Sequence, residues 1–111
     1  MLEIKKNDES EFRLLIVSGE LDMDSATRLI DSIRGALKGI SKLKIDLRDV
    51  AYVDSSGIAV LIQGYKLALK KSVEYILRDP SPQVMSVIEL SQLEDFFSYD
   101  RTDCDALGEG A

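Results

Sequence analysis

The sequence contains no histidine and no tryptophan, and Cys104 is its single cysteine. Because a Ser-His-Asp triad and a Cys-His pair both need histidine, neither can form within this chain. One cysteine cannot close an intramolecular disulfide, and without histidine it cannot complete the usual zinc ligand sets. The acidic pair Asp22 and Asp24 is typical of a helix start rather than of a metal site. We therefore expect no catalytic residue and no metal site.

Positive charge is in the minority, with 14 basic and 20 acidic side chains and a formal net charge of -6. Since no basic cluster stands against this acidity, we expect no binding to nucleic acid. No apolar run approaches the length of a membrane span, and the first residues are too polar for a signal peptide. The sequence therefore predicts a cytoplasmic protein without direct membrane insertion.

Apolar residues recur with the period of strands and of helices in alternation along the chain. Helices are expected from a cap at Asp24 or Ser25 to a stop at Gly39, over 57–70, and from Pro82 to Leu90. Strands are expected at 2–6, 12–18, 42–47 and 73–77, with a short strand or docking segment within 93–99. This order predicts an α/β fold, a mixed sheet of about four to five strands with helices packed on it. We expect one domain over 1–99 and a tail over 100–111 that belongs to the same domain or frays.

The stretch Val53-Asp54-Ser55-Ser56-Gly57-Ile58 lies where an extended segment turns into a helix. A hydroxyl at that junction lies among the unpaired N–H groups of a helix start, where the macrodipole favours negative charge. Such a position suits a phosphate group. The alternative is that Ser55 is an ordinary helix cap, although Ser56 is the better candidate for the cap or for a residue that shapes the loop.

Two motifs, Gly19-Glu20-Leu21-Asp22 and Asp54-Ser55-Ser56-Gly57, resemble those of the STAS family, particularly of bacterial anti-sigma factor antagonists. The resemblance covers residues 1–99. It implies that Ser55 is phosphorylated by an anti-sigma factor serine kinase of the histidine-kinase-like ATPase fold, and that a metal-dependent serine phosphatase reverses this. It also implies that the unphosphorylated form binds the anti-sigma factor and releases the sigma factor. ATP and magnesium would belong to the kinase, so this chain would need no cofactor.

The residues expected to bind the partner flank Ser55 on two loops. The loop after 12–18 should neighbour the loop that carries Ser55, because the strands before them should be adjacent. Asp54 is expected to shape its loop and to be recognised by the kinase, and Gly57 to let a partner's backbone come close. Met23 is either a small exposed apolar contact or the side of a loop. The predicted partner-binding residues are Asp22, Met23, Asp54, Ser56, Gly57 and Ile58.

A second function from another class is a STAS subunit of an ABC-type lipid transporter or of another membrane transporter. Such a domain docks on the transporter and does not need to be phosphorylated. The intact Asp54-Ser55-Ser56-Gly57 motif favours the anti-sigma factor antagonist. An enzyme is the third class, and the missing histidine together with the absence of a Gly-x-Ser-x-Gly elbow argues against it.

Overall fold

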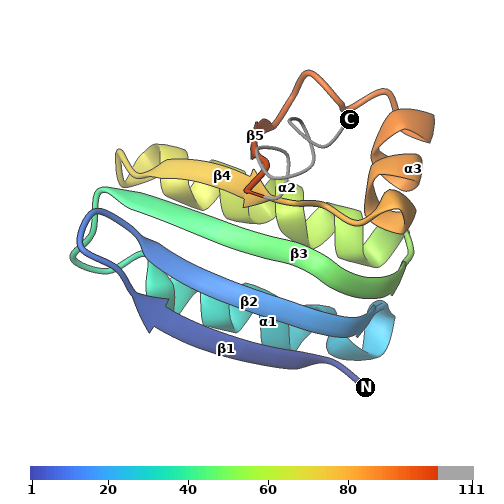
Figure 1. Ribbon diagram of the computed structural model, residues 1–111, viewed down its shortest axis with the longest axis horizontal. Helices are drawn as coiled ribbons and strands as arrows, with labels where there is room; N and C mark the ends of the chain where they lie inside the picture. Colours follow the sequence, from blue (N-terminus) through green and yellow to red (C-terminus); the bar gives the residue numbers. More distant parts are fainter. Residues whose placement is uncertain (103–111) are drawn as a thin grey trace.

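Five strands form one mixed sheet in the computed structural model, which describes residues 1–102 (Figure 1). The strands are adjacent in chain order, and only the first pair is antiparallel. They are β1 (Glu3–Asp8), β2 (Arg13–Leu21), β3 (Lys42–Val53), β4 (Glu74–Arg78) and β5 (Ser98–Asp100). The predicted mixed sheet of four to five strands is confirmed. Within the predicted tail, Asp100 belongs to β5, and residues 103–111 lie outside the described residues.

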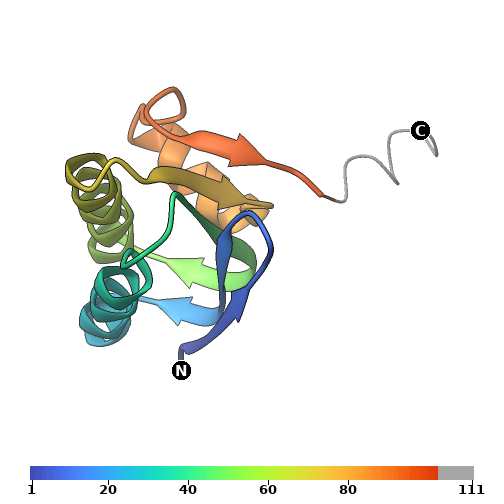
Figure 2. The same ribbon diagram turned by 90° about the vertical axis from the view of Figure 1, so that its left-hand side faces the viewer.

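Two long helices cover one face of the sheet and a shorter helix packs at one end. Helices α1 (Met23–Ala36) and α2 (Ser55–Lys70) lie side by side on the same face (Figures 1 and 2). Helix α3 (Pro82–Leu90) packs against β3 and α2, where the parallel strands finish. Each helix connects two parallel strands, as such strands require. The starts of α1 and α2 therefore lie at the same edge of the sheet.

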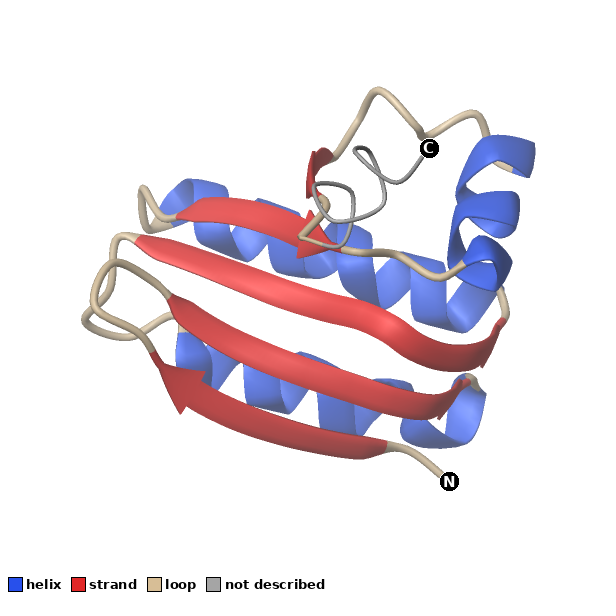
Figure 3. Cartoon of the chain, in the orientation of Figure 1, coloured by secondary structure: helices blue, strands red, loops and turns tan. Residues whose placement is uncertain are grey.

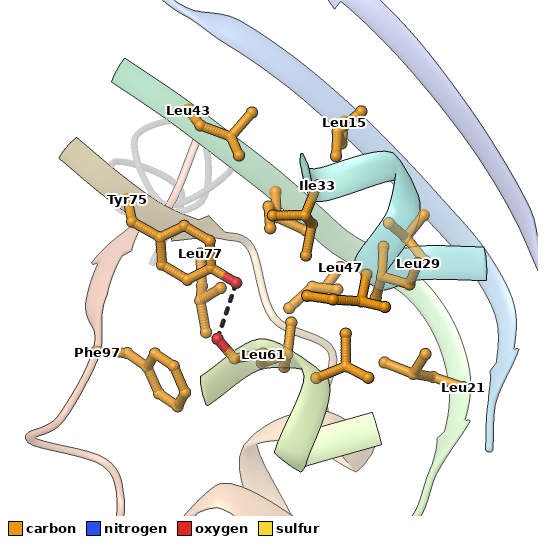
Figure 4. Packing of buried hydrophobic residues seen from close by; sticks show 14 of the residues in the cluster. Leu15, Leu21, Leu29, Ile33, Leu43, Leu47, Leu61, Tyr75, Leu77 and Phe97 are labelled. Carbon is orange, nitrogen blue, oxygen red and sulfur yellow. Dashed lines mark hydrogen bonds between the residues drawn. The ribbon is translucent and has the colours of Figure 1, made fainter. Parts of the chain in front are cut away.

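The core lies between the sheet and the two long helices. Alternate residues of the central strands point toward the helices, among them Leu15, Leu43 and Leu47 (Figure 4). From β4, the buried Tyr75 hydroxyl donates a hydrogen bond of 2.9 Å to the Leu61 carbonyl oxygen of α2. Burial raises the pKa of this hydroxyl, so Tyr75 stays neutral and joins α2 to the sheet.

Strand β3 is longer than the expected 42–47 and continues to Val53. The register between β2 and β3 shifts between Ile16 and Ser18 and again between Gly19 and Glu20. Such irregularities interrupt the simple alternation of apolar and polar residues, so this part of β3 reads as a connecting segment in the sequence. Helix α1 also differs from the prediction at its end, since it stops at Ala36, and Gly39 adopts its positive φ of 72° in the following turn.

Two helical glycines have opposite surroundings. At Gly64 of α2 an added Cβ would lie 2.5 Å from the Tyr75 hydroxyl oxygen, so only glycine lets this helix approach β4 so closely. At the exposed Gly35 of α1, an added Cβ would have no heavy atom within 4 Å beyond its own chain neighbours and helix backbone. The fold therefore needs glycine at position 64 but not at position 35.

Alanine substitutions should separate these two glycines. Gly35→Ala should raise the free energy of unfolding by about 0.5 to 1 kcal/mol, because alanine is the better helix former. Gly64→Ala should lower it by about 1 to 3 kcal/mol through overpacking against Tyr75. Urea unfolding followed by circular dichroism measures both changes. Equal destabilisation by the two variants would contradict this account of Gly35.

The end of the described chain is held by a nearly buried carboxylate. The Asp79 side chain is 9% exposed and accepts hydrogen bonds from Arg48 Nη2 at 2.6 Å and from the Thr102 amide at 2.9 Å. The Thr102 hydroxyl donates to the same carboxylate. Burial acts to raise the pKa of Asp79, but the hydrogen bonds from Thr102 and Arg48 outweigh it and hold this pKa below its ordinary value of 3.8. Asp79 therefore joins β3, β4 and the segment after β5.

Replacement of this carboxylate should give a pH-dependent loss of stability. The Asp79→Asn variant should be less stable than the wild type at pH 7 by about 1 to 3 kcal/mol, because it loses charge-assisted hydrogen bonds. Asparagine tolerates the positive φ of 48° at this position, so the change mainly removes the charge. A pKa lowered in the folded state stabilises the fold above 3.8, and this contribution disappears as the pH falls through the folded pKa. Urea unfolding between pH 7 and pH 3 should therefore show the gap closing below about pH 4, whereas a constant gap would refute this.

Candidate functional site

The ends of two neighbouring strands bring the two predicted loops together. Leu21 at the end of β2 is the register partner of Val53 at the end of β3. Beyond this pair, the Asp54 amide donates a hydrogen bond of 3.2 Å to the Leu21 carbonyl oxygen. The loop at Asp22 and the loop at Asp54 therefore form one edge of the molecule, at the starts of α1 and α2 (Figure 3).

Asp54 is the N-cap of α2. Its carboxylate oxygen accepts hydrogen bonds from the amides of Ser56 at 2.9 Å and Gly57 at 3.3 Å. The sequence had suggested Ser55 or Ser56 as the cap, and this was wrong. Ser55 is the first residue of the helix. Aspartate caps as well as serine does and also adds a negative charge at the positive end of the helix.

Asp22 has the same role at the start of α1. Its carboxylate accepts from the amides of Asp24 at 3.1 Å and Ser25 at 3.2 Å, while the Ser25 hydroxyl accepts from the Asp22 amide at 3.0 Å. This capping box corrects the expected cap at Asp24 or Ser25, because Ser25 is its third helical residue. The two adjacent loops thus share one construction, an aspartate cap after a parallel strand.

Ser55 is exposed, whereas Ser56 beside it is half-buried. Within residues 1–102 no hydrogen bond involves the Ser55 hydroxyl, since the capping bonds at this helix start are made by Asp54. Ser55 is therefore an exposed residue whose hydroxyl takes no part in capping α2.

Gly57 and Ile58 lie beneath this edge rather than on its surface. An added Cβ at Gly57 would lie 2.7 Å from side-chain carbons of both Leu21 and Val53, and Ile58 is 4% exposed. The sequence had suggested that Gly57 admits a partner's backbone and that Ile58 contacts the partner. Their burial gives them a different role, which is to hold the start of α2 tightly against the ends of β2 and β3.

Two large side chains on this edge are exposed. Met23, the first residue of α1, is 74% exposed, and its predicted contact with a partner stays a prediction. Tyr52 is 51% exposed and lies opposite Glu20 in the pairing of β2 and β3. Tyr52 is not among the residues predicted from the sequence, because residues 48–53 were expected to form a connection. The feature of the sequence that could have identified Tyr52 is an aromatic side chain only two positions before Asp54.

Comparison with known families decides the classification, since the family model described as the STAS domain matches residues 2–106. The chain belongs to the STAS domain family. This STAS domain is 27% identical to the anti-sigma-B factor antagonist of Listeria monocytogenes over 112 residues, covering 99% of this chain and 96% of the relative. It is 35% identical to the intermembrane phospholipid transport system binding protein MlaB of Escherichia coli over 79 residues, covering 71% of this chain and 79% of MlaB. The predicted resemblance is thereby confirmed.

Solved structures agree with this classification. An anti-sigma factor antagonist from Mycobacterium paratuberculosis superposes with a TM-score of 0.83 and 27% identity, covering 98% of this chain and 93% of that one. The antagonist SpoIIAA in its unphosphorylated form gives a TM-score of 0.75 at 20% identity, covering 96% of this STAS domain and 95% of SpoIIAA. At that identity the likeness shows a shared fold. Within residues 1–102, no helix is long and apolar enough to cross a bilayer.

Truncation of the cap at the start of α2 should destabilise the STAS domain. Asp54→Ala should lower the free energy of unfolding by about 1 kcal/mol, because the Ser56 and Gly57 amides lose their acceptor. Asp54→Asn should retain most of the stability, since its side-chain oxygen can still accept. The control is Asp24→Ala, which removes a first-turn carboxylate that makes no capping bond. If urea unfolding gives Asp54→Ala and Asp24→Ala the same stability, the capping role assigned to Asp54 fails.

Proposed function

We propose that this STAS domain is an anti-sigma factor antagonist that acts by partner switching. Its unphosphorylated form binds an anti-sigma factor kinase and so releases the sigma factor, and phosphorylation of Ser55 abolishes this binding. The observation that carries the proposal is the exposed Ser55 hydroxyl, free of hydrogen bonds within residues 1–102, on an edge shared with the Asp22 loop. The similarity to an anti-sigma-B factor antagonist over 99% of the chain supports it.

The proposed partners supply the chemistry that this chain does not. The kinase, of the histidine-kinase-like ATPase fold, brings ATP and magnesium, and a metal-dependent serine phosphatase removes the phosphate. The domain itself contributes the acceptor hydroxyl and the surface that both enzymes recognise. It therefore acts without enzymatic activity and without a cofactor of its own, in the cytoplasm where its partners are expected.

The recognition surface combines polar loop groups with two exposed apolar side chains. Asp22, Asp54 and Ser56 provide acceptors and hydroxyl groups around Ser55, and their positions are held by the two aspartate caps. Met23 and Tyr52 provide apolar area that is exposed in the free domain. Exposed aromatic and methionine side chains are enriched at protein interfaces, so we add Tyr52 to the predicted binding residues.

A phosphate on Ser55 should leave the fold intact. It adds about -1.5 to -2 charges at neutral pH. The dipole at the start of α2 favours this charge by about 0.3 to 1 kcal/mol. Repulsion from the neighbouring Asp54 carboxylate through water opposes it with about 1 kcal/mol. Because these contributions nearly cancel, modification changes the surface of the domain rather than its stability.

At an interface the same phosphate is strongly unfavourable. A partner surface that fits a hydroxyl would bury the added charge without compensating hydrogen bonds. Even a partial desolvation cost of about 3 kcal/mol weakens binding by about a hundredfold. The switch therefore acts through local charge and steric exclusion, without refolding.

The similarity to MlaB supports a second candidate, a STAS subunit of a lipid transport system. In that role the edge with Asp22, Met23 and Tyr52 would dock on the transporter, and Ser55 would not be phosphorylated. Co-purification from the native organism separates the two functions. A kinase of the histidine-kinase-like ATPase fold would support the antagonist, and a transporter ATPase would support the transport subunit.

Substitution of Ser55 tests the proposed switch. Ser55→Asp should weaken binding to the anti-sigma factor kinase by about ten- to a hundredfold, because a carboxylate carries part of the charge of a phosphate. Ser55→Ala should bind within about threefold of the wild type, since it removes only a hydroxyl. Isothermal titration calorimetry measures both affinities. Ser86→Asp, which adds the same charge on the exposed face of α3, is the matched control.

Incubation with the kinase and ATP, followed by mass spectrometric mapping, identifies the modified residue independently. Modification at Ser55 supports the proposal, and modification confined to residues other than Ser55 and Ser56 overturns the site. Full-affinity binding by Ser55→Asp would overturn the switch even if Ser55 is the residue modified.

A further inference from the structure

A groove with an apolar lining and a basic rim lies between the ends of α1 and α2, at the opposite end of these helices from Ser55. Its volume is about 460 Å³. The half-buried Leu67 supplies an apolar wall from α2, and Leu37 lies beneath the groove with 2% of its surface exposed. Gly35 adds no side chain on the α1 side. Figure 2 views the molecule from this end, with the two helices side by side.

Gly35 is the glycine at which an added Cβ meets no heavy atom in its surroundings and whose φ is not positive. The other glycines described within residues 1–102 either have a positive φ or would clash with a neighbour on gaining a Cβ. Glycine is a poor helix former, and nothing inside the domain compensates for it here. A glycine at an exposed helical position lets another molecule come close to the helix backbone, which gives Gly35 a role outside the domain.

The charges around the groove differ from those of the whole chain. The net charge of the chain is -6, whereas the groove is lined by three cations, Arg34, Lys38 and Lys71, and by one carboxylate, Asp31. The Asp31 carboxylate oxygen lies 3.4 Å from Arg34 Nη1 and partly neutralises the charge of this guanidinium. Cations also complement the carbonyl ends of α1 and α2, which are negative. Across residues 1–102, the ammonium groups of Lys38 and Lys71 form no ion pair and remain available to an anionic ligand.

We infer that this groove is a second docking surface, which binds an acidic amphipathic helical segment of a partner protein. Apolar side chains of the segment pack against Leu67, above the buried Leu37, and its backbone passes over Gly35. Its carboxylates pair with the ammonium groups of Lys38, just after α1, and of Lys71, just after α2. A helix laid in an apolar groove is a common mode of peptide recognition.

The surface goes beyond the proposed switch because it lies too far from Ser55 to sense its charge. Helix α2 has 16 residues, which corresponds to a length of about 24 Å. At physiological ionic strength, screening acts over about 8 Å. Binding at the groove therefore persists whether or not Ser55 is phosphorylated, so a partner held there stays attached while the edge at Ser55 releases.

The test is a titration of the isotope-labelled full chain followed by amide chemical shifts. The probe is a synthetic helical peptide with leucine at i, i+3, i+4 and i+7 and glutamate on the flanks, and the control peptide carries lysine in place of glutamate. Saturable shifts at Gly35, Lys38, Leu67 and Lys71 with the glutamate peptide alone support the inference. No saturable shift at these residues, or equal shifts with the lysine peptide, would overturn it.

Variants of the full chain locate the binding. Lys38→Glu combined with Lys71→Glu should weaken the glutamate peptide at least tenfold, and Gly35→Phe should do the same by filling the groove. Lys5→Glu combined with Lys6→Glu, at two exposed positions on β1, is the matched charge control and should leave the affinity unchanged, as should Ser55→Asp. Thermal unfolding confirms that each variant folds.

Vesicles of phosphatidylcholine and phosphatidylglycerol test the other class of anionic ligand. Absence of vesicle binding, or vesicle binding that the groove variants do not alter, supports a protein segment as the occupant. If the variant with Lys38→Glu and Lys71→Glu loses vesicle binding but keeps its affinity for the glutamate peptide, the inference is overturned in favour of a lipid surface. Failure of the unphosphorylated domain to bind the kinase, with intact groove binding, would refute only the proposed switch.

Discussion

The hydrogen bond from the Asp54 amide to the Leu21 carbonyl oxygen determines how the functional edge is built. It continues the pairing of β2 with β3 by one residue, at the point where both strands give way to helices. The close packing of Gly57 on Leu21 and Val53 depends on the same approach. The two aspartate caps then lie beside each other, and Asp54 caps α2 without the Ser55 hydroxyl. The exposed serine therefore has no capping role, because the neighbouring carboxylate has it.

The division of roles among adjacent residues follows from this arrangement. Asp54 is bound to the backbone, Gly57 and Ile58 face inward, and Ser55 faces solvent. Since the first turn of a helix directs successive side chains to different sides, neighbouring residues within 54–58 can cap the helix, face solvent or pack inward. A charge added at Ser55 therefore meets solvent rather than the core, which is consistent with a domain that is modified without unfolding.

Much of the fold could be predicted because its signals are local. Apolar periodicity located α1, α2, α3 and the first four strands, since a helix or strand with one buried face repeats that face along the sequence. The segment of β5 remained either a short strand or a docking segment. The missed features depend on partners distant in the chain. The bulged end of β3 is defined by its register with β2, and so Tyr52 was not recognised as a strand residue. The burial of Gly57 depends on Leu21, more than thirty positions earlier. Either Asp54 or a serine is an acceptable cap by residue type, and only the three-dimensional hydrogen bonds distinguish them.

The strand order has a consequence for how the chain reaches its native state. Every strand lies beside the strand that precedes it in the sequence, so no pairing has to wait for a distant segment. Each parallel pairing closes a loop that contains one helix, so its loop-closure entropy depends on one strand-helix-strand unit rather than on the whole chain. On the ribosome, each newly emerged strand would find its neighbour already in place, so the sheet can grow from β1 toward β5 as the polypeptide is synthesised.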